Sequence, residues 1–282
     1  MTEKEKKKVR VNSVKCIHLL QSIKKDIMKE HIRIPLLFIG RKWRHQLRIF
    51  KRLRRRIKSP SLLLYTSSIS LLNSSPPMVL SRKLTEPPYV DSIDWSKWSI
   101  FFLDERVVPL DHPDSNYKLA YDGFLSKVPI PESNIYPIKE RLSPEEAADE
   151  YEQRLKDLVA NKKLRTSEIT GFAKFDLMLV GMGPEGHVAS LFCWHFQRFE
   201  KIKWVTFIRD SPKPPSNRIT FTFPLINSAS EIAMVVTGED AADAVKVALG
   251  PHASYGFPLP VQKVSPEGGL TWFLDKAATS EL

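Results

Sequence analysis

The sequence contains few cysteines and no long apolar run, and both absences narrow the classes of protein that it can encode. Cys16 and Cys193 are the only cysteines among 282 residues, too few for a disulfide framework or for a zinc site of the usual spacing. No run reaches the ~18 apolar residues of a spanning helix, and the nearest, residues 62–72, is interrupted by serines. A Gly-x-Ser-x-Gly motif is also missing, which argues against a serine-nucleophile hydrolase. The sequence therefore predicts reduced thiols, no metal and no membrane partner.

Charge is distributed unevenly along the chain. The formal net charge is +11, but residues 1–80 hold 20 of the 43 Lys and Arg and only 4 of the 32 Asp and Glu. The basic total is thus a property of one end of the chain. Its densest part, residues 41–58, mixes arginine and lysine with Trp43, a composition that can bind a nucleic-acid backbone. A disordered or loosely helical segment without a partner explains the same composition, and we favour that interpretation.

A Ser- and Pro-rich stretch, residues 60–88, separates the basic end from a region of different character. Beyond it, residues 98–103, 175–180 and 232–236 are short apolar runs typical of buried strands. Residues 143–159 and 240–248 are predicted helices, the first opened by a capping box from Ser143 to Glu146 with Pro144 at its first position. This order predicts an α/β fold with an open, mainly parallel sheet and helices on both faces. We place the domain at residues 79–282, after a basic segment of residues 1–78.

The loop that follows the second strand is the most informative part of the sequence. Residues 181–187 read Gly-Met-Gly-Pro-Glu-Gly-His, at the edge where open α/β sheets bind ligands. We expect His187 near the first turn of a following helix, at the mouth of a crevice. The positive end of a helix would lower its pKa and keep it neutral, as a general base must be. A capping or core histidine fits the spacing equally well.

Other polar residues stand at places where a parallel sheet would bring them together. Asp104 and Arg106 end the first strand, and Asn116 lies in a turn-like Asp-Ser-Asn-Tyr stretch. Lys213 lies within a proline-rich loop, and Arg218 follows that loop. A carboxylate can orient a base, and Lys or Arg can bind an anion as a point charge or a fork. Taken singly, each is explained as well by a turn, a salt bridge or ordinary surface charge.

Together these segments resemble the 6-phosphogluconolactonase family, and its plant members in particular. The resemblance covers residues 79–282 and keeps the order of the family's segments. The matching strings are F-F-L-D-E-R (101–106), D-S-N-Y-K-L-A (114–120), F-D-L-M-L-V-G-M-G-P-E-G-H-V-A-S-L-F (175–192), D-S-P-K-P-P-S-N-R-I-T-F-T-F-P-L-I-N-S-A (210–229) and W-F-L-D-K-A-A (272–278).

The resemblance implies hydrolysis of 6-phospho-D-glucono-1,5-lactone to 6-phosphogluconate, without a metal or other cofactor. His187 would be the general base, and Asp104 and Arg106 would share the catalytic pocket. Substrate-binding residues carried over from the family are Gly183, Glu185, Asn116, Lys213 and Arg218. The sequence also resembles the hexosamine-6-phosphate isomerase/deaminases, which share the fold and the Gly-His loop. These enzymes have an F-N-E-P-like string where this chain has A-S-L-F (189–192). A catalytically impaired member with a nucleic-acid-binding basic segment is the other alternative.

The sequence departs from the family's pattern in three places. Nothing in residues 1–88 resembles the family's first helix, strand and Ser-Gly-Gly-Ser type phosphate loop. Glu185 stands where the family has Asp, and residues 193–200 (C-W-H-F-Q-R-F-E) replace a Pro-Asn-His-Pro-like stretch. We therefore expect residues 1–78 to be a foreign or mis-joined segment, the first βα unit to be replaced, and the sheet to lack a central strand, with poor solubility and little activity. A monomer in the cytosol is expected, with a plastid as the alternative compartment.

Overall fold

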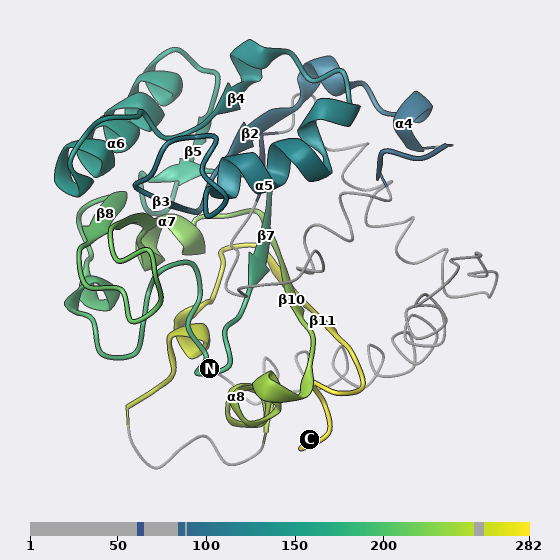
Figure 1. Cartoon of the computed structure of the whole chain (residues 1–282), viewed down its shortest axis with the longest axis vertical. Helices are drawn as coiled ribbons and strands as arrows, with labels where there is room; N and C mark the ends of the chain where they lie inside the picture. The colour runs from purple at the N-terminus through teal and green to yellow at the C-terminus, as the bar shows by residue number, and fades with distance from the viewer. Residues whose placement is uncertain (1–60, 65–83, 88, 251–256) are drawn as a thin grey trace.

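The computed structural model describes residues 61–64, 84–87, 89–250 and 257–282, and among the side chains of these it leaves out those of residues 61–64 and Tyr89. Its main sheet has the strand order β11-β10-β7-β1-β2-β4, and every neighbouring pair is parallel (Figure 1). An α/β fold with an open parallel sheet, as predicted, is confirmed. The strands are β1 (Ser61–Leu64), β2 (Ser99–Phe101), β4 (Ile135–Tyr136), β7 (Leu177–Gly181), β10 (Glu231–Val236) and β11 (Gly269–Leu274).

A second, antiparallel sheet has the order β3-β9-β8, with β3 at Asp104–Arg106, β9 at Arg218–Phe221 and β8 at Val205–Ile208. The sequence predicted the Asp-Glu-Arg triplet as the end of the preceding strand, whereas it forms a strand of its own. The reason is non-local, because β3 pairs with β9, more than a hundred residues later. A small hairpin, β5 (Arg165–Thr166) and β6 (Ala173–Lys174), completes the strands of the described residues.

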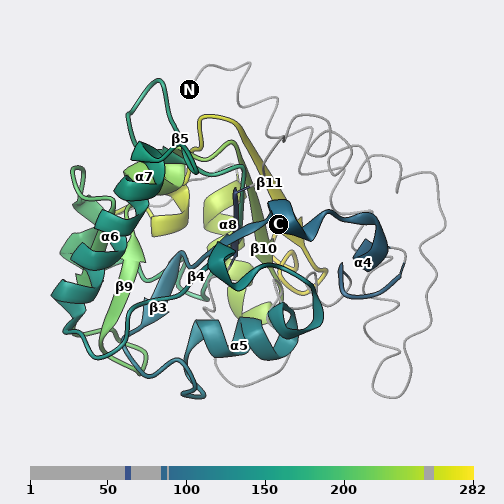
Figure 2. The same cartoon turned by 90° about the horizontal axis from the view of Figure 1, so that it is seen from above.

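Side chains of the central strands alternate between two apolar cores, one on each face of the main sheet. In β7, Met178 and Val180 join one core and Leu179 joins the other, as the period of two in a strand requires. The first core contains buried side chains of α6 (Pro144–Ala160) and α8 (Ala242–Leu249), and the second contains Ala120 of α5 (Asn116–Gly123). Helices therefore cover both faces, as predicted, and Figure 2 shows α6 and α5 as separate layers.

The described residues contain two further short helices and six 3₁₀ turns. These are α4 (Tyr89–Ser92), α7 (Phe223–Asn227), η1 (Trp95–Lys97), η2 (Leu125–Lys127), η3 (Glu132–Asn134), η4 (Phe196–Phe199), η5 (Glu239–Ala241) and η6 (Pro260–Lys263).

Helix α6 begins as its sequence predicted. The Ser143 hydroxyl accepts from the Glu146 N–H at 3.3 Å, and the Glu146 carboxylate accepts from the Ser143 N–H at 2.9 Å. These two bonds satisfy two of the N–H groups that a helix start leaves without intrahelical partners. The buried Tyr151 hydroxyl donates to the Tyr136 carbonyl at 2.7 Å and accepts from the Phe102 N–H at 3.0 Å. The helix is thereby fastened to the sheet edge near Asp104.

Strand β1 corrects one prediction. The sequence predicted a sheet without its central strand, but β1 lies between β7 and β2 and pairs with both, Leu62 facing Leu177 and Ile100. A short run of serine and leucine is enough here, because a strand between two parallel neighbours needs apolar residues rather than a particular motif. The strand comes from within the segment predicted to be foreign. The residues that follow it, 65–83, and the basic stretch 41–58 lie outside the described residues, so the missing phosphate loop and the domain boundary at residue 79 stay predictions.

Candidate active site

The loop after β7 folds back on itself and brings His187 against its own start. The Gly183 N–H donates to the His187 carbonyl at 3.0 Å, and the Gly186 N–H donates to the Gly183 carbonyl at 2.9 Å. Gly186 has φ +79° and Ala189 has φ +52°, the left-handed values that such a tight reversal requires. Between β7 and η4 the chain forms turns and isolated bridges but no helix. The prediction that His187 lies in the first turn of a helix is therefore wrong.

The imidazole of His187 is buried, with 1% of its surface exposed. It lies over Gly183 so closely that a Cβ there would be 2.1 Å from its Cε1. On another side it contacts the Phe192 ring, with centroids 4.6 Å apart. His187 is thus enclosed by its own loop rather than placed at the mouth of a crevice, and that prediction is also wrong. Gly183 is required because the imidazole fills the space of a side chain.

Burial, not a helix end, determines the charge state of His187. Removal from water lowers the pKa of the imidazole, and the neighbouring Glu185 carboxylate only partly offsets this effect. His187 Nδ1 lies 2.8 Å from Glu185 Oε1, although the two groups are not aligned as a hydrogen bond. Burial works to raise the pKa of Glu185, but His187 and Lys213 outweigh it and lower that pKa to about 2. The imidazole is therefore neutral and lies beside an ionised carboxylate. A general base requires this arrangement.

Lys213 and Glu185 form the exposed side of this cluster. The Lys213 ammonium lies 3.1 Å from Glu185 Oε2, and about two fifths of each side chain is exposed. A Lys–Glu–His chain therefore runs from solvent to the buried imidazole. The proline-rich loop thus brings Lys213 to the histidine loop, where its partner is Glu185. Its predicted role in binding the substrate stays a prediction.

Asp104 and Arg218 meet across the pairing of β3 with β9. In this register Arg106 faces Arg218, and Asp104 faces Thr220. Burial raises the pKa of Asp104, while the nearby Arg106 and Arg218 charges act against that rise. Burial is the main cause that lowers the pKa of Arg218 to about 10, and the charge of Arg106 is the second cause. The Arg218 guanidinium is therefore still charged at neutral pH. Two arginines facing each other beside one carboxylate make a site that favours an anion.

Ser190 joins the histidine loop to this charged pair, and sequence reasoning missed it. Its hydroxyl donates to Asp104 Oδ2 at 2.7 Å and accepts from Arg218 Nη1 at 3.3 Å. Its N–H donates to the Thr220 hydroxyl at 3.2 Å. Ser190 is fully buried, and a buried hydroxyl must find such partners. The available signal was its position three residues after His187 in the Gly-His string, which was used only to recognise the family.

Asn116 is hydrogen-bonded to the backbone of Asp104 and to the side chain of Glu105. Its side-chain amide donates to the Asp104 carbonyl at 2.8 Å, and its N–H donates to Glu105 Oε1 at 2.7 Å. Asn116 is buried at the start of α5, where Ser115 is the N-cap. The geometry makes Asn116 a positioning residue for the strand that carries Asp104. Its predicted role in substrate binding stays a prediction.

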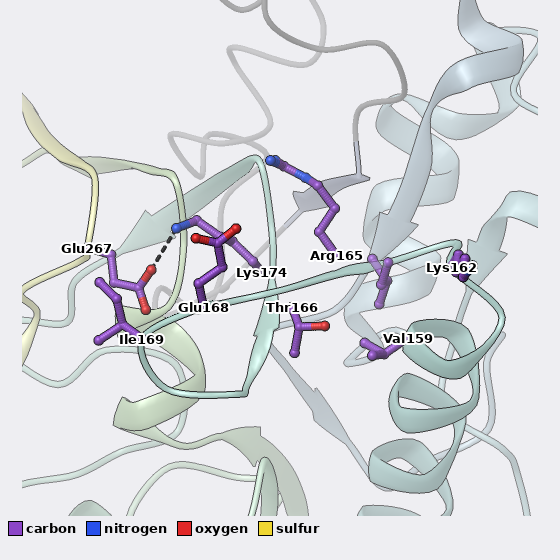
Figure 3. A pocket seen from close by; sticks show the side chains of 9 residues that line it. Val159, Lys162, Arg165, Thr166, Glu168, Ile169, Lys174 and Glu267 are labelled. Atoms are coloured by element: carbon purple, nitrogen blue, oxygen red, sulfur yellow. Dashed lines mark hydrogen bonds and ion pairs between the residues drawn. The ribbon is translucent and has the colours of Figure 1, made fainter.

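The predicted catalytic residues thus lie in one cluster, in which His187 and Asp104 are buried and Arg106 is half-buried. Phe192 links its two halves, because the His187 ring and the Arg218 guanidinium both lie against it, the latter 5.8 Å from its centroid. None of these residues lines the hollow of about 600 Å³ in Figure 3, which lies between α6, the β5–β6 hairpin and Glu267. Within the described residues, no group of three or more His, Cys, Asp or Glu is placed to hold a metal ion.

Comparison with known proteins gives one family. The model of the glucosamine-6-phosphate isomerases/6-phosphogluconolactonase family matches residues 74–272. The chain is 61% identical over 202 residues to "Probable 6-phosphogluconolactonase 3, chloroplastic" of Oryza sativa subsp. indica, and 62% identical over 201 residues to "6-phosphogluconolactonase 3, chloroplastic" of Arabidopsis thaliana. These matches cover 71% of this chain and 62% and 61% of the two relatives. The chain thus spans less than two thirds of their length.

Solved structures give the same fold. The 6-phosphogluconolactonase of Thermotoga maritima superposes with a TM-score of 0.66 at 26% identity, covering 82% of this chain and 93% of its own. A monomeric glucosamine-6-phosphate deaminase superposes with a TM-score of 0.64 at 19% identity, covering 83% of this chain and 93% of its own. At that identity the deaminase is evidence of a shared fold only.

Proposed function

The chain belongs to the glucosamine-6-phosphate isomerase/6-phosphogluconolactonase family, and on this basis we propose that it hydrolyses 6-phospho-D-glucono-1,5-lactone to 6-phospho-D-gluconate in the oxidative pentose phosphate pathway. The observation that carries the proposal is a neutral, buried His187 beside Glu185, in one cluster with the facing pair Arg106 and Arg218. Hydrolysis of a phosphorylated lactone requires a base that activates water, and binding of the substrate requires a site for the phosphate anion.

His187 would act through its Nε2 atom. Because Nδ1 lies beside the Glu185 carboxylate, the proton of the neutral ring belongs on Nδ1 and leaves Nε2 as the acceptor. Nε2 takes a proton from water as the water oxygen bonds to the lactone carbonyl carbon. The bond from that carbon to the ring oxygen then breaks, and the imidazolium returns its proton to the leaving oxygen. Glu185 stabilises the imidazolium between these two transfers, which balances the reaction without a cofactor.

The phosphate of the substrate would be bound by arginine. Arg218 keeps its charge at neutral pH and is held in place by the Lys213 and Pro215 carbonyls, at 2.7 and 3.0 Å. Arg106 faces it across β3 and β9, and Asp104 limits the repulsion between the two cations. The lactone would approach from the side of Lys213, the half-exposed end of the chain of charges that leads to His187.

A plastid is the compartment that the relatives support. Both relatives compared above carry the word chloroplastic in their names, which favours the plastid over the cytosol that we expected from the sequence. A fluorescent fusion of the full chain, imaged in plant cells against a plastid marker, tests this inference. Uniform cytosolic fluorescence would contradict it.

The activity is tested by following 6-phosphogluconate with the dehydrogenase that oxidises it, after subtraction of spontaneous lactone opening. We expect His187→Ala to lower the enzymatic rate by about 10²–10⁴-fold, the usual contribution of a general base. Arg218→Lys keeps the charge but loses the fork, so KM should rise by about tenfold with a smaller change in kcat. Full activity in His187→Ala would refute the proposal. Ammonia release from glucosamine 6-phosphate would favour the isomerase/deaminase alternative instead.

A further inference from the structure

Glu105 is a buried carboxylate that the proposed reaction does not use. It stands between Asp104 and Arg106 in β3, and none of its surface is exposed. Its side chain leaves the strand on the face opposite to those of its two neighbours, because successive side chains of a strand alternate. A carboxylate removed from water is costly unless hydrogen bonds replace those to water. The partners of Glu105 therefore indicate its role.

Four donors from β3 and from the start of α5 surround the carboxylate. Oε1 of Glu105 accepts from the N–H groups of Arg106 and Asn116, both at 2.7 Å. Oε2 accepts from the Tyr117 N–H at 2.8 Å and from the Ser115 hydroxyl at 3.3 Å. An ionised carboxylate has about four acceptor positions, so these donors occupy all of them.

These bonds complete the first turn of α5. The N–H groups of Asn116 and Tyr117 donate to Glu105, and the N–H of Lys118 donates to the Ser115 hydroxyl at 3.2 Å. The first N–H groups of a helix lack partners within it, and a negative charge beside them also interacts favourably with the helix dipole. Glu105 therefore fixes the start of α5 against β3, although a loop separates the two elements in the sequence.

Asn116 connects this attachment to Asp104. Its side-chain amide donates to the Asp104 carbonyl at 2.8 Å and to Asp104 Oδ1 at 3.4 Å. Asp104 Oδ2 accepts from the Ser190 hydroxyl, which in turn accepts from Arg218. A shift of the first turn of α5 would therefore displace the Asp104 carboxylate and, through Ser190, the guanidinium of Arg218.

Arg106 is attached to the same turn at two points. Its N–H donates to Glu105, and its Nη1 donates to the carbonyl of Asp114, the residue before the N-cap Ser115. In the pairing of β3 with β9, Arg106 faces Arg218. Glu105 thus has a site residue on each side of it, and both of these residues are bonded to the start of α5.

A second carboxylate makes a similar attachment away from the site. Glu152 joins α6 to β8, because its Oε2 accepts from the N–H groups of Trp204 and Val205 at 2.7 and 3.0 Å. Its Oε1 pairs with Lys156 at 2.6 Å. None of these three partners belongs to the predicted site, whereas two of the four donors to Glu105 do. The two carboxylates therefore differ in what they hold rather than in how they hold it.

We propose that Glu105 is a positioning residue of the anion site, which holds β3 against the first turn of α5 and thereby sets where Asp104 and Arg106 lie. The inference rests on the proposed function, in which Arg106 and Arg218 bind the phosphate of the lactone. The proposed base lies on the loop after β7, beside Glu185. Loss of the Glu105 bonds should therefore weaken substrate binding more than it slows the chemical step.

The principal variant is Glu105→Gln, which keeps the size of the side chain but has one accepting oxygen in place of two. Because both carboxylate oxygens accept from backbone N–H groups, either orientation of the amide places its NH2 group against an N–H. Lactonase kinetics are measured at about pH 8, because burial raises the pKa of Glu105 to about 7 against the N–H groups that lower it. We expect KM to rise by about tenfold and kcat to change by less than about threefold.

Glu152→Gln is the matched control, because it alters a carboxylate that also joins a helix to a strand. It should lower the unfolding temperature and leave KM unchanged. If Glu105→Gln behaved in the same way, with a lower unfolding temperature and the wild-type KM, Glu105 would be a structural cap and the inference would be wrong.

A further variant and a binding measurement complete the test. Asn116→Ala keeps the N–H that donates to Glu105 but loses the bonds to Asp104, so it should fold even where Glu105→Gln does not, and raise KM by about tenfold. A wild-type KM in Asn116→Ala would also overturn the inference.

Binding of inorganic phosphate, followed by phosphorus NMR, separates this inference from the proposed function. We expect Glu105→Gln to weaken phosphate binding by about tenfold. That result in a protein without lactonase activity would refute the proposed function and support the positioning role. An active wild type whose KM and phosphate binding are unchanged in Glu105→Gln would refute the positioning role alone.

Discussion

Replacing Gly183 by alanine tests the placement of the proposed base most directly. A Cβ at this position would lie 2.1 Å from Cε1 and 2.2 Å from Nδ1 of His187, where ordinary contact begins at 3.4 Å. The imidazole must therefore retreat by about 1.3 Å, or the loop must open by as much. Either movement takes Nδ1 away from Glu185, so the ring loses its position and its partner together.

The size of the effect follows from that displacement. A misplacement of about 1 Å in a reacting group costs about a hundredfold in rate, so we expect kcat of Gly183→Ala to fall by about a hundredfold. KM should change little, because the arginines proposed to bind the phosphate are not touched. The backbone of Gly183 is not left-handed, so alanine is permitted there. Any loss of stability therefore comes from the clash, about 1–3 kcal/mol.

The assay is the coupled lactonase measurement, with a thermal unfolding curve for each variant. Gly171→Ala is the matched control: Gly171 has φ +77° and no atom within 4 Å of the added Cβ. That substitution should cost about 1 kcal/mol through its backbone conformation and leave kcat unchanged. If Gly183→Ala kept the wild-type kcat, His187 could not be the base in the position described.

Three further predictions follow from the same cluster and from β1. Ser190→Ala removes the hydroxyl bonded to Asp104, so we expect the pKa of that carboxyl to rise further and kcat to fall by about tenfold, with a loss of about 1–3 kcal/mol in unfolding free energy. Glu185→Gln removes the charge that raises the pKa of His187, so the acidic limb of the pH profile of kcat/KM should move to lower pH, while the plateau falls. Deleting residues 1–58 should leave a folded, active protein, whereas deleting residues 1–78 removes β1 and should give aggregates.

Each of these predictions has its own control. Ser228 is also a buried serine, with its hydroxyl bonded to the Ala173 and Leu225 carbonyls, so Ser228→Ala should destabilise the protein without a change in kcat. A limb that moves to higher pH in Glu185→Gln would show that the Glu185 charge does not raise the pKa of His187. Active, monodisperse protein from the shorter deletion product, residues 79–282, would show that β1 is dispensable.

Features encoded by neighbouring residues were predictable from the sequence. The capping box of α6 involves residues three apart, and the buried strands β7 and β10 are continuous apolar runs, so pattern alone placed them within a few residues. The nearness of Asp104 and His187 followed from the rule that parallel strands present their ends at one sheet edge, whereas Arg218 reaches them through the antiparallel pairing of β3 with β9.

Features encoded by distant residues were not predictable. The pairing of β3 with β9 depends on segments more than a hundred residues apart, and no local pattern in the Asp-Glu-Arg triplet specifies a strand. The expected helix after His187 was wrong because the glycine loop closes on itself through bonds to Gly183. β1 was missed because four residues, Ser-Leu-Leu-Leu, are too short to distinguish a strand from an apolar linker.

The central place of β1 has a consequence for biosynthesis. Leu62 leaves the ribosome early, but its partner Leu177 follows more than a hundred residues later, and such distant pairings form slowly. Until then β1 can pair on one side only, with β2, which follows it much sooner in the chain. The nascent chain must therefore carry a strand with one open edge through much of its translation, and yields of native protein should depend on chaperones that shield that edge.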